Sequence, residues 1–168
     1  MPIGKLYRTW KEQLRAFRPN QRITQIENFA WMMVGIDQSR SAHLSKIAGK
    51  VYGQAKLLSA VKRFERFLDN KAIEARAWYQ SIAKQWIVAQ WQQLGEIRLS
   101  VDGAKVGFAH QLLMVSVAYR RRSLPIAWDW VKQVRGHSSA EKQIELLKYV
   151  KTLLPKKVVV VLVGDSEF

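Results

Sequence analysis

Two aspartates have the position and the chemistry of metal ligands, because each comes at the end of an apolar segment typical of a β-strand. Asp102 follows Ile97–Val101 in the motif SVDGAKVG, and Asp165 follows Val158–Val163 in the motif VVVLVGDSEF. If the two strands are neighbours in one sheet, their ends bring the carboxylates together. Two close carboxylates repel each other unless a cation lies between them, and Mg²⁺ or Mn²⁺ prefers such oxygen ligands.

A pair of divalent ions about 4 Å apart can activate an attacking oxygen and stabilise a leaving one in phosphodiester chemistry. Asp102 and Asp165 are therefore candidate catalytic and metal-binding residues. Taken singly, each aspartate has a simpler interpretation, Asp102 as a turn residue and Asp165 as a helix N-cap. The strand order and the basic neighbouring domain favour the metal site.

A second group of residues has the chemistry of DNA binding. Apolar spacing predicts a helix from about 54 to 68, preceded by a short helix and a turn with two glycines, an arrangement over about 41–68 that resembles a helix-turn-helix. A helix in the major groove needs cations for the phosphates on both walls and polar groups for the base edges. A solvated helix face is the alternative interpretation. The polar side of the second helix carries Lys56, Ser59, Lys62, Arg63 and Arg66.

The remaining pattern predicts the elements that position both groups. Before Gly95, apolar residues recur at helical spacing, which indicates an all-helical basic domain over 1–94. After it, β-branched runs and one helix indicate a mixed sheet over 95–168 in the order β-β-β-α-β, a fold of the α+β class with an α/β-like parallel crossover. The expected elements are the strands Ile97–Val101, Gln111–Tyr119 and Leu124–Val131, a turn at Arg120–Ser123, the helix Ser139–Leu154 and the strand Val158–Val163.

Local signals refine this picture. Capping-box spacing occurs at Thr24–Glu27 and at Ser138–Glu141, which predicts two helix starts. The last strand, Val158–Val163, is apolar throughout, as expected of a strand covered on both faces. Asp129 lies between two tryptophans and is expected at the surface. A long helix over about 72–94 is expected to bury its tryptophans, Trp78, Trp86 and Trp91.

The bulk composition points to a polyanionic partner. The chain has 168 residues, of which 48% are apolar, and a net charge of +15. Such a charge repels itself in a compact fold, and a polyanion offsets that repulsion. Nucleic acid is the first candidate and an anionic membrane surface the second. Up to Gly95 the chain carries 16 Lys and Arg against 6 Asp and Glu, so the helical half holds two thirds of the excess.

Several classes of site are excluded or unsupported. The chain has no cysteine, which excludes disulfides, cysteine-liganded zinc and iron–sulfur clusters. Its first residues show no apolar signal-peptide core, and the longest apolar run is far short of a membrane span. We therefore expect a soluble intracellular protein. No phosphate-binding loop is present, so no nucleotide cofactor is expected. The three histidines, His43, His110 and His137, are too scattered for a metal-ligand motif.

Three segments together resemble the insertion-sequence DDE transposases: VDGAKVGFAHQLLMVSVAYRRRSLPIAW, then RGHSSAEKQ, then LVGDSEF. The resemblance covers about Ile97 to Phe168. It implies a ribonuclease H-like core in which two aspartates and one glutamate hold two divalent ions, with Asp102 as the first aspartate and Asp165 as the second. It also implies double-stranded DNA at element ends as partner, in a bacterial cytosol. Further DNA contacts are expected from Lys105, Arg120, Arg121, Arg122 and Arg135.

The chain departs from the family in one respect. The family's third carboxylate lies on a later helix, whereas this sequence stops three residues after Asp165, and Glu167 falls within the second aspartate motif. The resemblance therefore implies a truncated catalytic core over 95–168 that is inactive alone. Two alternatives stay open: a non-catalytic DNA-binding fragment that inhibits transposition, and another ribonuclease H-like nuclease. A homodimer also stays open.

Overall fold

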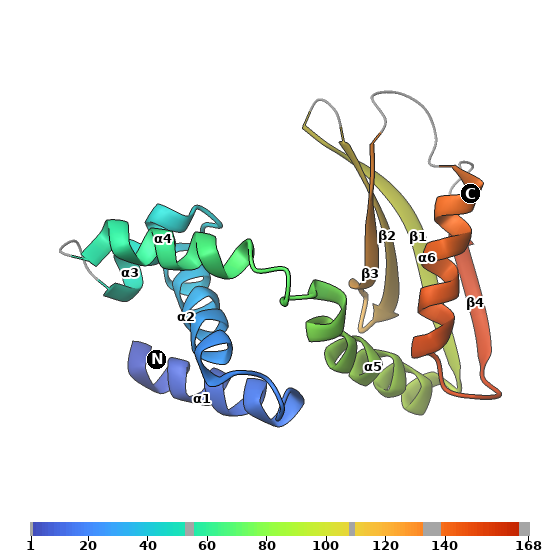
Figure 1. Ribbon diagram of the computed structural model, residues 1–168. Coiled ribbons are helices and arrows are strands. Elements are labelled where there is room, and N and C mark those ends of the chain that lie inside the picture. Colours follow the sequence, from blue (N-terminus) through green and yellow to red (C-terminus); the bar gives the residue numbers. More distant parts are fainter. Residues whose placement is uncertain (1, 53–55, 108–109, 133–138, 165–168) are drawn as a thin grey trace. The chain divides into compact units, whose positions relative to one another are not determined.

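The structure is a computed structural model of the 168-residue chain and describes residues 2–52, 56–107, 110–132 and 139–164 (Figure 1). The chain divides into two compact units, residues 1–74 and 75–168. This boundary differs from the one expected at Gly95, because helix α5 (Ala75–Leu94) packs against the strands that follow it. The long helix begins the second unit and does not end the first.

The first unit is all-helical, as expected. Its helices are α1 (Ile3–Phe17), α2 (Ile23–Ser39), α3 (Leu44–Tyr52) and α4 (Leu57–Leu68). Helices α2 and α3 approach closely at Gly35, where an added Cβ would overlap the Ile47 side chain and lie 2.9 Å from the Ile47 carbonyl oxygen. The core of this unit comes from α2, α3 and α4 and consists of Met32, Ile47, Ala48, Ala60, Phe64 and Phe67.

Helix α1 is attached to α2 by mixed apolar and polar contacts. The Tyr7 ring stacks on Trp31 with 3.9 Å between the ring centroids. One turn further on, Lys11 Nζ donates to Glu27 Oε1 at 2.7 Å. Burial, followed by the nearby Glu27 carboxylate, raises the pKa of Tyr7. The carboxylate that the sequence assigned to a capping box therefore serves helix packing.

The second unit is a four-stranded mixed sheet with two helices. Antiparallel pairs join β1 to β2 and β2 to β3, whereas β4 pairs parallel to β1, which gives the order β3-β2-β1-β4. The predicted α+β class and the β-β-β-α-β succession are confirmed. The elements after α5 are β1 (Glu96–Val106), β2 (His110–Tyr119), β3 (Arg122–Val131), α6 (Ala140–Leu153) and β4 (Val159–Gly164).

The core of this unit lies on one face of the sheet. Side chains alternate between the two faces of a strand, and in β1 Ile97, Leu99 and Val101 are buried. Val101 pairs with Val115 of β2, and the same face continues through that strand into β3. Helices α5 and α6 complete this core with Ala83, Ile87, Leu146, Val150 and Leu153.

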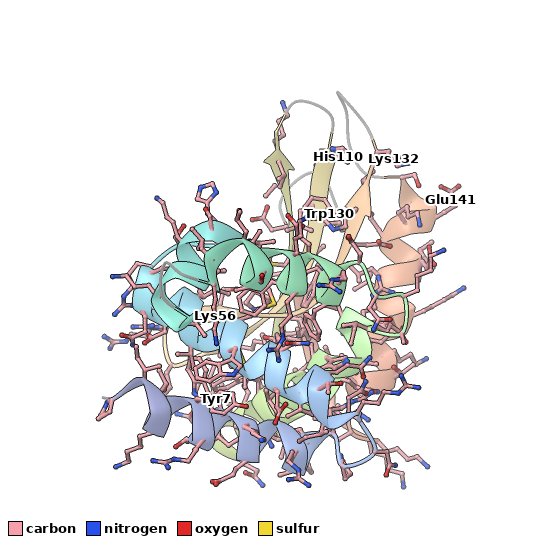
Figure 2. All side chains as sticks on the ribbon, turned by 60° about the vertical axis from the view of Figure 1, so that its left-hand side comes forward. Tyr7, Lys56, His110, Trp130, Lys132 and Glu141 are labelled. Atoms are coloured by element: carbon pink, nitrogen blue, oxygen red, sulfur yellow. The ribbon has the colours of Figure 1, made fainter. Side chains whose placement is uncertain are left out.

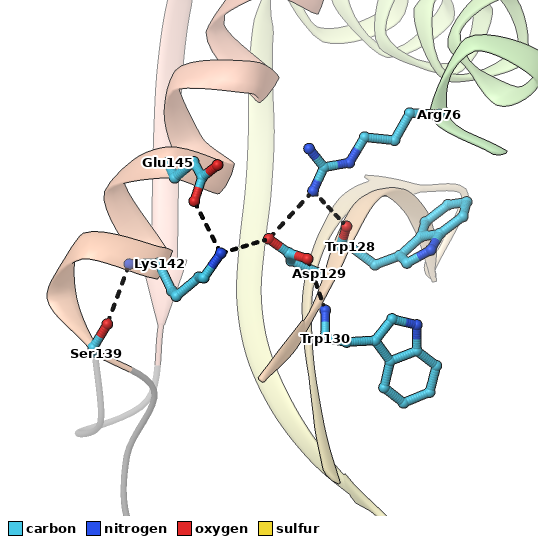
Figure 3. Close-up of polar contacts among 7 residues, drawn as sticks. All are labelled: Arg76, Trp128, Asp129, Trp130, Ser139, Lys142 and Glu145. Atoms are coloured by element: carbon cyan, nitrogen blue, oxygen red, sulfur yellow. Dashed lines mark hydrogen bonds and ion pairs between the residues drawn. The ribbon is translucent and has the colours of Figure 1, made fainter. Parts of the chain in front are cut away.

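A polar contact also holds both helices to β3. The Asp129 carboxylate lies 3.5 Å from Arg76 Nη2 of α5 and 3.8 Å from Lys142 Nζ of α6 (Figure 3). The Arg76 guanidinium also donates to the Trp128 carbonyl oxygen at 3.0 Å. A hydrogen bond to Glu145, followed by the charges of Glu145 and Asp129, raises the pKa of Lys142. Asp129 is thus half-buried and links both helices to β3.

Several local expectations are also corrected. Helix α2 begins at Ile23 after Arg22, with no side-chain cap, so the Thr24 capping box does not form. Helix α6 is capped by Ser139, whose Oγ accepts from the Lys142 backbone N–H at 3.4 Å; Ser138 lies outside the described residues. Trp78 is buried as expected, but 39% of Trp91 is exposed.

Strand β4 lacks the cover that its composition led us to expect. All six of its residues are exposed, including Val159 at 62% and Leu162 at 48%. Helix α6 packs on β2 and β3, and α5 packs on β1, β2 and β3. Within the described residues, neither helix covers β4, and the strand also forms one edge of the sheet. Exposed apolar edge strands promote association.

Replacing Asp129 by Asn should destabilise the second unit, because Arg76 and Lys142 lose a shared, half-buried counter-charge. We expect a loss of about 1–2 kcal/mol in the free energy of unfolding, measured by urea denaturation. Glu145→Gln is the matched control, since Glu145 contacts the same Lys142 but is 62% exposed. Equal losses in the two variants would show that Asp129 does not hold the helices.

Replacing Leu162 by Lys should reduce aggregation of the chain without lowering its melting temperature, because this side chain is exposed on an edge strand. Light scattering at fixed concentration measures the first effect and thermal unfolding the second. Leu58→Lys, at a position 78% exposed on α4, adds the same charge elsewhere. If both variants reduce aggregation equally, net charge and not β4 is responsible.

Candidate functional site

The predicted DNA-binding residues share one face of α4. Successive residues of an α-helix are rotated by about 100°, so positions 56, 59, 62, 63 and 66 fall within an arc of about 120°. Four of these side chains are exposed and that of Arg63 is half-buried. The preceding turn at 53–55 lies outside the described residues. This basic face, defined by Lys56, Ser59, Lys62, Arg63 and Arg66, contains no acidic residue.

The opposite side of α4 fixes the orientation of the basic face. Ala60, Phe64 and Phe67 are buried in the core of the first unit, where they pack with α2 and α3. Leu68, the last residue of α4, is 54% exposed. Because α4 cannot rotate without exposing Phe64, the five polar residues are held toward solvent.

Asp102 lies inside β1 and not at its end. The strand continues to Val106, and Asp102 pairs with Met114 of β2 in the antiparallel ladder. Its neighbour Val101 is buried in the core, so strand alternation places the Asp102 side chain on the opposite face of the sheet, where it is exposed. Asp102 is therefore not a turn residue.

The second aspartate, Asp165, lies outside the described residues. The last described residue before it, Gly164, pairs with Val101 in the parallel ladder between β1 and β4. In the sequence, Asp102 directly follows Val101 and Asp165 directly follows Gly164. Among the described residues, no group of three or more His, Asp or Glu side chains could hold a metal ion. Those residues alone do not make a divalent-cation site.

The arginines at 120–122 lie at the other end of the sheet from Asp102. Arg120 and Arg121 form a two-residue hairpin turn with φ of 47° and 63°, the left-handed conformations of a type I′ turn. Arg122 belongs to β3 and pairs with Tyr119. The ladder from Asp102 to this turn spans about six residues, or about 20 Å. The structure does not bring these cations to the aspartate.

The two other predicted DNA contacts differ in position. Lys105 is exposed in β1, three residues beyond Asp102, and strand alternation puts the two side chains on opposite faces. Arg135 lies outside the described residues. Neither residue is therefore placed beside Asp102.

The second unit also contains a hollow that was not predicted from the sequence. It has a volume of about 450 Å³ and is lined by Val106, His110, Trp130 and Lys132 at the ends of β1, β2 and β3. The rings of His110 and Trp130 meet edge to face with their centroids 6.2 Å apart (Figure 2). The alternation of residues along a single strand does not predict such a hollow, because the residues that line it come from the ends of three strands.

The positive charge is shared between the units. Residues 1–74 contain 14 Lys and Arg against 6 Asp and Glu, and residues 75–168 contain 14 against 7. The prediction that the helical domain holds two thirds of the excess positive charge depended on assigning α5 to that domain. Charge therefore does not by itself select the DNA-binding unit. In the part of the chain that the structure describes, no helix is long and apolar enough to cross a membrane.

No family model, curated protein or solved structure matches the chain. Two local features of the chain bear on its function, the basic face of α4 and the register of β1 with β4. The first is a candidate nucleic-acid interface made entirely of described side chains. The second is a candidate metal site of which only Asp102 is described.

Proposed function

We propose that the protein binds duplex DNA through α4 and is a transposase of the DDE class, with a ribonuclease H-like core in its second unit. The observation that carries the DNA-binding part is the basic face of α4. It presents three exposed cations, the half-buried Arg63 and the Ser59 hydroxyl, and its opposite side is fixed in a core.

The chemistry of this face suits a DNA groove. Lys56 and Lys62 are exposed, and they lie near the two limits of the polar arc. Long cations at such positions reach the phosphates on either side of the groove, while Ser59 lies between them and suits a base edge. Phosphate contacts provide most of the affinity and make it dependent on salt.

The transposase part of the proposal is supported by topology. The β-β-β-α-β succession, with β4 parallel to β1, agrees with the core that the sequence resemblance implies. In that core Asp102 and Asp165 would hold Mg²⁺ or Mn²⁺, which activates an attacking oxygen and stabilises a leaving one. The exposed position of Asp102 on a sheet face without core packing is compatible with this role. The bacterial cytosol, where chromosomal DNA lies, is the corresponding location.

A second function is favoured by one observation. The described residues hold every member of the basic face of α4, but only Asp102 of the two proposed metal ligands. The basic face alone would suffice to bind element ends and to compete with a transposase. Both functions need the basic face of α4, whereas only the first needs strand cleavage.

The double variant Lys56→Ala/Lys62→Ala should weaken duplex binding and flatten its salt dependence. Each phosphate contact contributes about −0.9 to the slope of log affinity against log salt, so the loss of one or two contacts changes the slope by about 1–2. Fluorescence anisotropy across a salt series measures it. Lys148→Ala/Lys151→Ala on α6 removes equal charge from exposed sites of the other unit. Equal slopes in both double variants would place the interface elsewhere.

The 168-residue chain should not cleave or join DNA in Mg²⁺ or Mn²⁺, because the two-ion mechanism that the resemblance implies needs a third carboxylate besides Asp102 and Asp165. A gel assay with end-labelled duplexes gives the answer. Metal-dependent cleavage that disappears in Asp102→Ala would contradict this prediction and would identify a complete site. Cleavage that persists in Asp102→Ala would indicate a contaminating nuclease.

A further inference from the structure

A second feature of the first unit lies beside the basic face of α4. A cleft of about 470 Å³ separates the first turns of α2 from α4. It shares three residues with the basic face and adds others from α2 and from the segment after α4. Its lining consists of Arg22, Thr24, Gln25, Asn28, Ser59, Arg63, Arg66, Phe67 and Asn70.

The cleft is strongly cationic. Three arginines line it, and no Asp or Glu does. Like charges that share a hollow repel each other unless an anion lies between them. Two of these guanidinium groups are oriented by the protein. Arg63 Nε donates to Asn28 Oδ1, and Arg66 Nε donates to the Lys62 carbonyl oxygen at 3.2 Å.

A buried hydrogen-bond donor in this cleft has no acceptor. Gln25 is only 8% exposed, and its Oε1 accepts from Gln21 Nε2. The direction of that bond is fixed, because Gln21 Oε1 accepts from Arg18 Nη2 at 3.4 Å. The Gln25 amide must therefore present its Nε2 as a donor. Among the described residues, Nε2 of Gln25 has no hydrogen-bond acceptor, and buried polar groups rarely stay unpaired.

The other polar side chains of the cleft can also donate hydrogen bonds. The Oδ1 atom of Asn28 is already used by Arg63, so its Nδ2 amide is the group left to bind a ligand. Helix α2 has no side-chain cap, and its first turn, with Thr24, lines the cleft. An uncapped helix N-terminus favours an anion. A lining with three guanidinium groups and amide donors, and with no carboxylate among its described residues, fits a ligand with only acceptor atoms.

From these observations we infer that the cleft binds one phosphate group, with Gln25 Nε2 and the guanidinium groups of Arg22, Arg63 and Arg66 as its donors. Arginine pairs with phosphate through two parallel hydrogen bonds, which a tetrahedral oxyanion accepts readily. This inference rests on the proposed DNA binding for the source of the phosphate, a backbone phosphodiester beside α4. A free phosphate has the same chemistry, and the experiment separates the two sources.

The test uses the full chain and two readouts. The side-chain amide signals of Gln25 are followed by ¹H–¹⁵N NMR during titration with a mixed-sequence duplex and, separately, with inorganic phosphate. The salt dependence of duplex binding is compared between Arg22→Ala and Arg8→Ala, which removes the same charge from an exposed position on α1 outside the cleft. Gln25→Glu keeps the side-chain shape but replaces the donor by a carboxylate.

We expect the duplex to shift the Gln25 signals and Arg22→Ala to flatten the salt slope by about 0.9 more than Arg8→Ala. Gln25→Glu should weaken duplex binding with little change in melting temperature. The inferred phosphate site would be overturned if the duplex binds with unchanged Gln25 signals and the two arginine variants have equal salt slopes. The proposal that DNA binds the basic face of α4 would then still stand. If no duplex binds, the proposed function fails. A shift caused by inorganic phosphate would then assign the cleft to a free phosphate, and no shift would overturn it.

Discussion

The second unit depends on the register of one strand, β1. Alternate residues of β1 enter the core beneath α5 and α6, and the residues between them, including Asp102, lie on the other face. A shift of one residue would bury the Asp102 carboxylate and expose Val101. The same strand fixes β4, whose Gly164 pairs with Val101. Core packing and the proposed metal site therefore depend on a single alignment.

Polar contacts explain why α5 belongs with the sheet. The Gln90 side chain is 1% exposed, its Oε1 accepts from the Arg98 backbone N–H at 2.8 Å, and its Nε2 donates to the Ala118 carbonyl oxygen. One buried amide thus joins α5 to β1 and β2, as Asp129 joins α5 and α6 to β3. The change of composition near Gly95 marks a change of secondary structure and not a boundary between units.

The sequence alone predicted those elements in which the periodic pattern of apolar residues is complete. The helix α6, the strands β2 and β3 and the basic face of α4 are each marked by a full period of apolar residues. The end of β1 was not predictable in this way, because Asp102 and Gly103 have the chemistry of a turn, yet both pair with β2. The cleft was also missed, because Arg22 and Gln25 meet Arg63 only when α2 packs beside α4. Contacts between distant segments decide such features.

Two groups of atoms lack partners in the described chain, and they require different chemistry. The apolar side chains of β4 are satisfied only by further apolar surface. The Nε2 donor of the buried Gln25 amide, in the cleft of the first unit, is satisfied only by a hydrogen-bond acceptor. The first group lies in residues 75–168 and the second in residues 1–74. The proposed phosphate contact and the exposed strand β4 are thus separate physical problems in separate units.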